Sequence, residues 1–468
     1  MADKTEKVLR VGTLTVIGSL DPHRAHDSTG HLVLSQVFDS PYARVEGRIE
    51  PRLVAGAPIR RDSTTFELEL RNDLRFSDGS PVTASDVASS IKYALTPLGI
   101  DAASAGDRVL LRSQSWRHRP EEVLSTVAAK VAKRVDRSAL GTGPFMIAET
   151  SGRGVKLVRN PYALRRPKVD AIDIRWFVPG ADGRPDALVS ALEAGEIDFT
   201  ISLARDDVAN LQRVRKLFQP GMSTAFLSIN TSAPHLARVQ TRRAIALAID
   251  RYRLAELCYS NPAAFVARCL IPPALGRGSD GIRHDPAAAK AMLGDAKLPE
   301  KLQMVRVWGP RPYLARPDAV AIGITQQLRV LGTRVETVAA KDSEDYAALL
   351  ARGHYDLVLG GWLADTPDPI DYLDSTVGSG GILGTGQVPV AASNYSRWRD
   401  DEVDRLLVEA RAGAGTRAID DILARVASEV PLVPLMHGPR VIVHAWRVKG
   451  YDPDASVFPD FATIDLDD

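Results

Sequence analysis

Three histidines near the start of the chain form a candidate metal site. His23, His26 and His31 lie close together in the sequence, with Asp21 and Asp27 among them. Imidazole and carboxylate groups together suit zinc, nickel or copper. A His-x-x-His pair in an extended segment, however, lacks the i, i+4 spacing that places two ligands on one face of a helix. The spacing favours a structural or ligand-lining role over a metal site, and we expect no metal or other cofactor.

Two carboxylates later in the chain form a candidate ligand site. Asp365 and Asp368 flank Pro367 and follow an apolar segment, residues 355–359 (YDLVL). In open α/β sheets, ligands bind in the crevice beyond the carboxyl ends of the strands, so these two positions stand out among the acidic residues. The alternative is that both are turn residues, because Asp favours turns.

The motifs of common enzyme classes are missing from the sequence. It contains no G-x-x-x-x-G-K phosphate loop and no G-x-S-x-G nucleophile elbow, and the glycine-rich segment 378–386 lacks the dinucleotide-binding spacing. The two cysteines, Cys258 and Cys269, have no histidine nearby in the sequence. They either pair with each other or are free thiols, and two cysteines in 468 residues exclude a disulfide-built scaffold. We therefore expect no catalytic residues.

Residues 98–139 are rich in basic side chains with two aromatic rings among them. They include Arg108, Arg112, Trp116, Arg117, His118, Arg119, Lys130, Lys133, Arg134 and Arg137. A nucleic-acid or phosphate-binding patch is one interpretation, but acidic residues such as Glu121 dilute the charge. The whole chain carries 59 basic and 58 acidic residues, so its net charge of +1 recruits neither nucleic acid nor anionic membrane. We expect a solvated, basic helical face and no nucleic-acid partner.

Strand and helix patterns alternate along the chain, as is typical of sheets with helices packed on their faces. Residues 8–17 and 65–70 alternate like β-strands, and Thr83 with Asp86 three residues later predicts a capped helix start. A length of 468 residues predicts two to four domains at about 100–200 residues each. No segment has the roughly 18 consecutive apolar residues needed to span a bilayer.

The first residues lack the composition of an export signal. Arg10 and Gly12 interrupt the apolar segment, no small-residue cleavage site follows, and no early cysteine offers a lipid anchor. If Met1 is the native start, we expect the protein in the cytoplasm. A removed signal or a start placed too late would reverse that expectation.

Several segments resemble, in order, the large solute-binding proteins of peptide-importing ABC transporters. This family includes oligopeptide-, dipeptide- and nickel-binding members. The most specific match is residues 76–87 (FSDGSPVTASDV). The other matches are 19–23 (SLDPH), 141–145 (GTGPF), 159–162 (RNPY), 191–198 (ALEAGEID), 228–231 (SINT), 242–251 (RRAIALAIDR), 285–293 (DPAAAKAML), 355–357 (YDL), 361–365 (GWLAD) and 430–435 (VPLVPL).

The resemblance implies an α/β protein with a two-lobed, type II periplasmic-binding-protein-like fold, a hinged cleft and a small inserted domain. By motif position, lobe I comprises residues 1–56, 140–257 and 436–468, the insertion comprises 57–139, and lobe II comprises 258–435. The interval between Ala94 and Gly141 is short for this family. We therefore expect a reduced inserted domain.

The resemblance also implies five ligand-binding residues. Asp365, in a Gly-Trp-x-x-Asp context, matches the family carboxylate that pairs with the α-ammonium of a bound peptide, a charge that needs a partner when buried. Trp362 matches the neighbouring aromatic wall. His26 and Ser28 fall in the segment that lines the first-lobe side, where oligopeptide binders can carry an acidic residue. Asn230 lies in a hinge-strand motif and is either structural or ligand-contacting.

The main hypothesis is a binding protein rather than an enzyme. It would close its lobes around a short peptide or another amine-bearing small solute and deliver it to an ABC permease. By family resemblance we expect an extracytoplasmic, monomeric protein. The alternative is a signal-less cytoplasmic enzyme or sensor that reuses the same cleft, for example in specialised metabolism; the missing signal and the short insertion motivate it.

Overall fold

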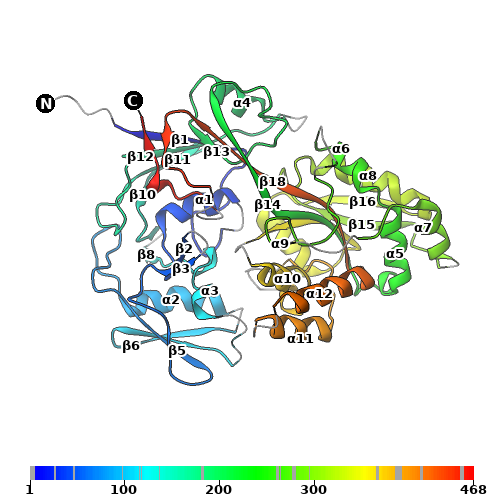
Figure 1. The fold of residues 1–468 in the computed structure, drawn as a ribbon, viewed down its shortest axis with the longest axis horizontal. Coiled ribbons are helices and arrows are strands. Elements are labelled where there is room, and N and C mark those ends of the chain that lie inside the picture. The colour runs from blue at the N-terminus through cyan, green and yellow to red at the C-terminus, as the bar shows by residue number, and fades with distance from the viewer. Residues whose placement is uncertain are drawn as a thin grey trace. The chain divides into compact units, whose positions relative to one another are not determined.

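The chain divides by its internal packing into two compact units. The computed structural model describes residues 6–25, 28–45, 48–96, 99–114, 116, 119–135, 138–180, 184–259, 263, 265–276, 281–294, 296–311, 313–364, 368–384, 393–411, 415–453 and 458–467. Unit 1 comprises Met1–Leu203, Asn210–Leu217 and Ile442–Asp468, and unit 2 comprises Ala204–Ala209 and Phe218–Val441. The long strands β14 (Val214–Ile229) and β18 (Leu432–Ala445) carry the chain from one unit to the other, in green and red in Figure 1.

Unit 1 is built on a mixed sheet whose first strand is the predicted one. Its strands are β1 (Val8–Thr13), β10 (Phe145–Ser151), β11 (Gly154–Arg159), β12 (Ala171–Trp176) and β13 (Phe199–Thr200), in the order β10-β11-β12-β1-β13, followed by the end of β18. β1 pairs in parallel with β12 and β13, whereas β10, β11 and β12 are antiparallel neighbours. The helices α1 (Ser28–Val37) and α4 (Asp186–Glu193) belong to the same unit.

A second sheet lies within the segment predicted as the insertion. Strands β4 (Ile59–Arg60), β5 (Thr65–Glu69), β6 (Asp101–Ala105) and β7 (Arg108–Arg112) form it in the order β4-β5-β7-β6, and helix α2 (Ala84–Leu95) belongs to the same core. The predicted cap of α2 is confirmed. The Thr83 hydroxyl accepts from the Asp86 amide at 3.2 Å, and the Asp86 carboxylate accepts from the Thr83 amide at 2.9 Å.

The expectation of a basic helical face at 98–139 is wrong. The described part of this stretch contains the strands β6, β7 and β8 (Lys133–Val135), and its α-helix is the one-turn helix α3 (Pro120–Val123). Val109 and Leu111 of β7 are buried in the core, and arginines form the two ends of the strand. Arg108 Nη1 lies 2.6 Å from Glu67 Oε1, so part of the basic charge forms ion pairs within the sheet.

The remaining strands of unit 1 are short. They are β2 (Tyr42–Val45), β3 (Arg48–Pro51), β9 (Ser138–Leu140), β19 (Val448–Lys449) and β20 (Asp465–Leu466). They pair as β2-β3, β8-β9 and β19-β20.

Unit 2 surrounds a sheet in the order β18-β14-β17-β15-β16, in which β15 is Lys301–Arg306, β16 is Arg334–Ala339 and β17 is Leu357–Leu363. Its helices are α5 (Val239–Ala248), α6 (Arg251–Glu256), α7 (Pro286–Leu293), α8 (Pro317–Leu328), α9 (Ser343–Arg352), α10 (Pro369–Val377), α11 (Asp401–Glu409) and α12 (Gly415–Glu429). Figure 1 shows α10, α11 and α12 packed beside one another.

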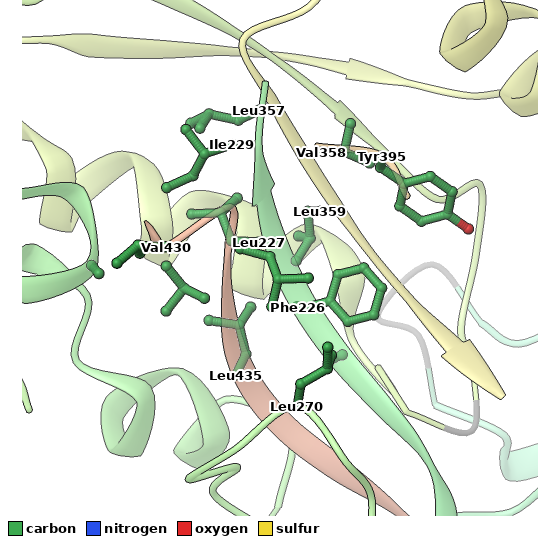
Figure 2. Packing of buried hydrophobic residues seen from close by; sticks show 14 of the residues in the cluster. Phe226, Leu227, Ile229, Leu270, Leu357, Val358, Leu359, Tyr395, Val430 and Leu435 are labelled. Carbon is green, nitrogen blue, oxygen red and sulfur yellow. The ribbon is translucent and has the colours of Figure 1, made fainter. Parts of the chain in front are cut away.

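The core of unit 2 lies along its central strands. Phe226, Leu227 and Ile229 of β14 pack with Leu357 and Leu359 of β17, as Figure 2 shows. β17 is antiparallel to β14 and parallel to β15, so its apolar segment is buried in the middle of the sheet. Residues 218–257, which motif position assigned to the first lobe, pack within unit 2, because α5 lies against α7 and α6 against α8.

Within the part of the chain that the structure describes, no helix is both long and apolar enough to cross a membrane.

Candidate functional site

The ends of two parallel strands define a candidate ligand site in unit 2. β15 and β17 are in register from Met304↔Leu357 to Arg306↔Leu359, so their carboxyl ends lie at the same edge of the sheet. The segment from Val307 to Arg311 follows β15, and Trp362 and Leu363 end β17. This edge is where open α/β sheets bind ligands.

Trp362 is held at this edge by tight packing of its neighbours. It pairs with Thr224 of β14, and its side chain is half-buried against the core of unit 2. Gly361, the preceding residue, lies so close to the Thr224 carbonyl and the Tyr313 ring that a Cβ atom would overlap both. The strand can therefore present Trp362 only because residue 361 has no side chain.

A guanidinium group also lies at this edge. Arg311 stacks over the Trp308 ring, with its Cζ atom 3.6 Å from the ring centroid, and its Nη1 donates to the Pro310 carbonyl at 3.1 Å. Trp308 in turn contacts Tyr346 at a centroid distance of 5.7 Å. The stacking orients a permanent positive charge on a rigid aromatic surface, which suits recognition of a carboxylate.

A half-buried histidine and several buried tyrosines lie near this edge. His437 Nδ1 lies 2.9 Å from the Thr224 hydroxyl, which itself donates to the Leu270 carbonyl at 3.0 Å, so Nδ1 carries the proton and donates. Burial lowers the pKa of His437 to about 4. Burial likewise raises the pKa values of Tyr313, Tyr346 and Tyr395. These groups are neutral near pH 7, and Arg311 is the charged member of this set.

The predicted site residues fall in different parts of the chain. Asp365 and His26 lie outside the described residues, and Ser28 is the first residue of α1. Asp368 caps α10, accepting from the Ile370 amide at 2.8 Å, which matches the turn-residue alternative.

Asn230 directly follows the last residue of β14, six residues after Thr224. It is 2% exposed, its Nδ2 donates to the Gly353 and Tyr355 carbonyls, and its Oδ1 accepts from Ser232. These contacts favour the structural alternative for Asn230.

The histidines of the N-terminal candidate cluster have separate environments. His23 is buried, with Nε2 2.9 Å from the Lys130 carbonyl, and burial lowers its pKa. His31 packs against Phe458 at a centroid distance of 5.8 Å. Among the described residues, which exclude His26 and Asp27, no group of three His, Cys, Asp or Glu side chains is placed to hold a metal ion.

Comparison with known proteins identifies the family. The model of "Bacterial extracellular solute-binding proteins, family 5 Middle" matches residues 48–384, more than half of the chain. The chain belongs to this family. The predicted resemblance is thereby confirmed.

Relatives of this family 5 protein include the probable ABC transporter periplasmic-binding protein SapA of Escherichia coli K12. The two are 27% identical over 335 residues, which cover 68% of this chain and 58% of SapA. The match therefore spans less than two thirds of that relative's length.

Two solved structures share the fold of this family 5 protein. The DppA protein of Helicobacter pylori, in complex with the peptide STSA, has a TM-score of 0.84 at 19% identity and covers 98% of both chains. The dipeptide-binding protein of Pseudoalteromonas sp. SM9913, in complex with Met-Leu, has a TM-score of 0.82 at 17% identity and covers 98% of this chain and all of that chain. The predicted periplasmic-binding-protein-like α/β fold is confirmed.

Arg311 is the residue of this edge that sequence reasoning missed. It lies five residues after the end of β15, and Asp365 was selected because it follows an apolar segment that forms β17. The same rule applied to the segment that forms β15 would have identified Arg311.

Proposed function

We propose that this family 5 protein binds a short peptide, or another small solute that carries an amine, and delivers it to an ABC importer. The observation that carries the proposal is the shared edge at the ends of β15 and β17, where Arg311 and Trp362 lie. The family match supports a binding protein over the enzyme or sensor alternative.

In this proposal, two side chains of opposite charge bind the two ends of the solute. Asp365, which follows Ala364 in the sequence, pairs with the ammonium group, and Trp362 supplies apolar contact and cation–π attraction. The guanidinium of Arg311 pairs with a carboxylate of the solute. A zwitterionic dipeptide carries both groups, and a charge-assisted hydrogen bond to each favours it over a neutral analogue.

We further propose that the protein works on the outer side of the cytoplasmic membrane as a monomer. The family description names extracellular proteins, and the Escherichia coli relative is named a periplasmic-binding protein of an ABC transporter, which supports this location. His26 and Ser28 remain candidate contacts of the bound solute. The predicted boundaries of the two lobes and of the insertion also stay a proposal.

Calorimetric titration tests the amine anchor. We expect the purified chain to bind Met-Leu, and to bind N-acetyl-Met-Leu at least about tenfold more weakly, because the acetyl group removes the positive charge. In the Asp365→Asn variant, this preference for the free amine disappears. The control is Glu300→Gln, which changes an exposed carboxylate of unit 2 by the same charge and leaves both affinities unchanged.

Native mass spectrometry of protein purified from its own cell adds a direct readout of the retained solute. A mixed peptide pool that produces no binding, together with no retained amine-bearing solute, would overturn the proposed function. Binding of Met-Leu that Asp365→Asn leaves unchanged would overturn the amine anchor alone.

A further inference from the structure

A pocket lies in unit 2, away from the strand-end site. It has a volume of about 620 Å³ and is lined by Thr231 and Ser232 after β14, by α5 and α12, and by the loop 397–400. Ile229, close to this pocket, pairs with Leu357, whereas Trp362 lies five residues further along β17. At about 3.3 Å per residue, roughly 17 Å of strand separates the two places. The pocket is therefore distinct from the strand-end site.

The carboxylates of this pocket are already neutralised. Asp400 caps α11 and accepts from the Arg425 Nε atom at 2.7 Å on both of its oxygens. Glu429 lies 3.3 Å from Arg242, whose guanidinium also donates to the carbonyls of Leu236 and Ala237. Each acidic side chain of the lining thus has an arginine of its own.

Two further arginines, Arg397 and Arg399, also line the pocket. Among the residues that the structure describes, neither Arg397 nor Arg399 forms an ion pair with a carboxylate. Arg399 is exposed, and Arg397 uses its Nη1 to donate to the Leu383 carbonyl at 3.2 Å. The pocket therefore carries an excess of two positive charges, beside the hydroxyls of Thr231 and Ser232.

The backbone that presents these arginines is rigidly held. Asn394 is 1% exposed; its Nδ2 donates to the Gly378 and Trp398 carbonyls, and its Oδ1 accepts from the Ser396 hydroxyl at 2.7 Å. This network spans the turn that contains Arg397. Donors held in one geometry before a ligand arrives lose little entropy on binding.

Backbone strain marks the same place. Among the described residues, Arg397 and Val430 are the non-glycine residues with positive φ, at 53° and 52°. Arg397 lines the pocket, and Val430 follows Glu429, which also lines it. A β-branched residue in this conformation is a rare outlier, and such strain clusters at sites that hold ligands.

We propose that this pocket binds a small dianion, such as inorganic phosphate or a phosphate monoester, independently of the solute at the strand-end site. The planar guanidinium of Arg399 matches the geometry of phosphate oxygens, and Arg425, whose Nε atom binds Asp400, also lines the pocket. A volume of about 620 Å³ leaves room for the organic part of an ester.

The test is calorimetric titration of the dialysed full chain with inorganic phosphate and with glycerol 3-phosphate, at physiological ionic strength. We expect saturable binding of one equivalent, at least about tenfold weaker in Arg399→Gln. Arg399 is exposed, so this variant folds. Arg329→Gln removes the charge of another exposed arginine of unit 2, outside the pocket, and should bind as the unchanged protein does. Tighter binding of the ester identifies it as the occupant, and equal binding identifies the free ion.

The affinity for Met-Leu separates the two sites. We expect saturating phosphate and the Arg399→Gln substitution each to leave that affinity unchanged. The proposal is overturned if millimolar phosphate does not bind, if Arg399→Gln and Arg329→Gln weaken binding equally, or if phosphate competes with the peptide. Binding of an acidic peptide but of neither phosphate compound would also overturn it, in favour of a protein partner.

Discussion

Arg311 is the described residue of the strand-end site whose charge most directly constrains a solute. Its guanidinium is fixed by stacking on Trp308 and by the bond to Pro310, so it meets a ligand without first losing much rotamer entropy. Arg311→Gln should weaken Met-Leu binding by about ten- to a hundredfold, as expected for one charge-assisted interaction. Binding of the C-terminal amide of Met-Leu should be unchanged.

Calorimetric titration of the unchanged protein and of Arg311→Gln, each with Met-Leu and with its C-terminal amide, measures whether Arg311 contacts the carboxylate. The matched control is Arg253→Gln, whose guanidinium is 70% exposed and paired with Glu256 on α6. Equal weakening of acid and amide by Arg311→Gln would show that Arg311 does not contact the carboxylate.

Protonation of His437 makes the free energy of unfolding depend on pH. Its pKa in the folded chain is about 4, against about 6.5 for an unfolded histidine, so the unfolded state takes up the proton first as the pH falls. The free energy of unfolding should therefore decrease between pH 6.5 and pH 4. In His437→Gln, whose amide can still donate to Thr224, this slope should be smaller.

Urea unfolding across this pH range measures the slope. His354→Gln, at an exposed position, is the control and should keep the slope of the unchanged protein. The interpretation fails if both variants have the same pH dependence.

Among the elements, β17 depends on a glycine. A Cβ atom at Gly361 would lie 2.6 Å from Tyr313 Cδ2 and would also overlap the Thr224 carbonyl, so the pairing of β17 with β14 must shift. We expect Gly361→Ala to lower the free energy of unfolding by about 2 kcal/mol, the range for overpacking, and to weaken solute binding because Trp362 moves with the strand.

Gly309→Ala is the matched control for this variant. Gly309 lies in the segment after β15, and an added Cβ would meet nothing within 4 Å. Unfolding in urea and calorimetry of Met-Leu should show the Gly309→Ala protein unchanged. If both glycine variants behave alike, steric overlap at 361 does not limit β17.

Helix α2 offers a test of local capping in the inserted segment. Thr83→Ala removes the hydroxyl that accepts from the Asp86 amide, and we expect a loss of about 1 kcal/mol in unfolding free energy. Ser85→Ala, in the exposed first turn of the same helix, should change stability by less than about 0.5 kcal/mol. Thermal unfolding compares the two, and an equal effect would mean that the cap contributes nothing.

At the scale of the whole molecule, Asp198 ties distant segments of unit 1 together. Its side chain is 1% exposed and binds Arg10 of β1 and Arg447, next to β19, each with contacts of 2.7 and 2.8 Å. Burial alone would raise the pKa of Asp198, but the bonds from Arg447 and Arg10 outweigh it and lower the pKa. The carboxylate is therefore charged and structural near neutral pH.

Asp198→Asn should lower the free energy of unfolding by about 3 kcal/mol at neutral pH, because two arginines lose their shared partner. An unfolded Asp has a pKa of about 3.9, so the contribution is fully present above pH 4 and is lost as the pH falls through the lower folded pKa. The difference in unfolding free energy between the variant and the unchanged protein should therefore decrease at acid pH.

Denaturant unfolding from neutral to acid pH checks this prediction. Asp73→Asn is the control, because its pair with Arg71 is exposed and should contribute less than about 1 kcal/mol. A gap for Asp198→Asn that stays constant down to the lowest pH would contradict the assigned role of the charge.

The sequence by itself determined the family, the α/β class and several local structures, because these depend on short-range patterns. The cap formed by Thr83 and Asp86, and the first strand of alternating residues from Val8, involve neighbours in the chain. Only the tertiary structure decided that Asp101–Ala105 and Arg108–Arg112 form strands, because Val109 and Leu111 are buried by partners distant in the sequence. It likewise decided that Arg311 shares an edge with Trp362, and that Arg397 and Arg399 form no ion pair with a carboxylate of the described residues. Charge pairing and strand order depend on which segments meet, and residue spacing along a chain does not contain that information.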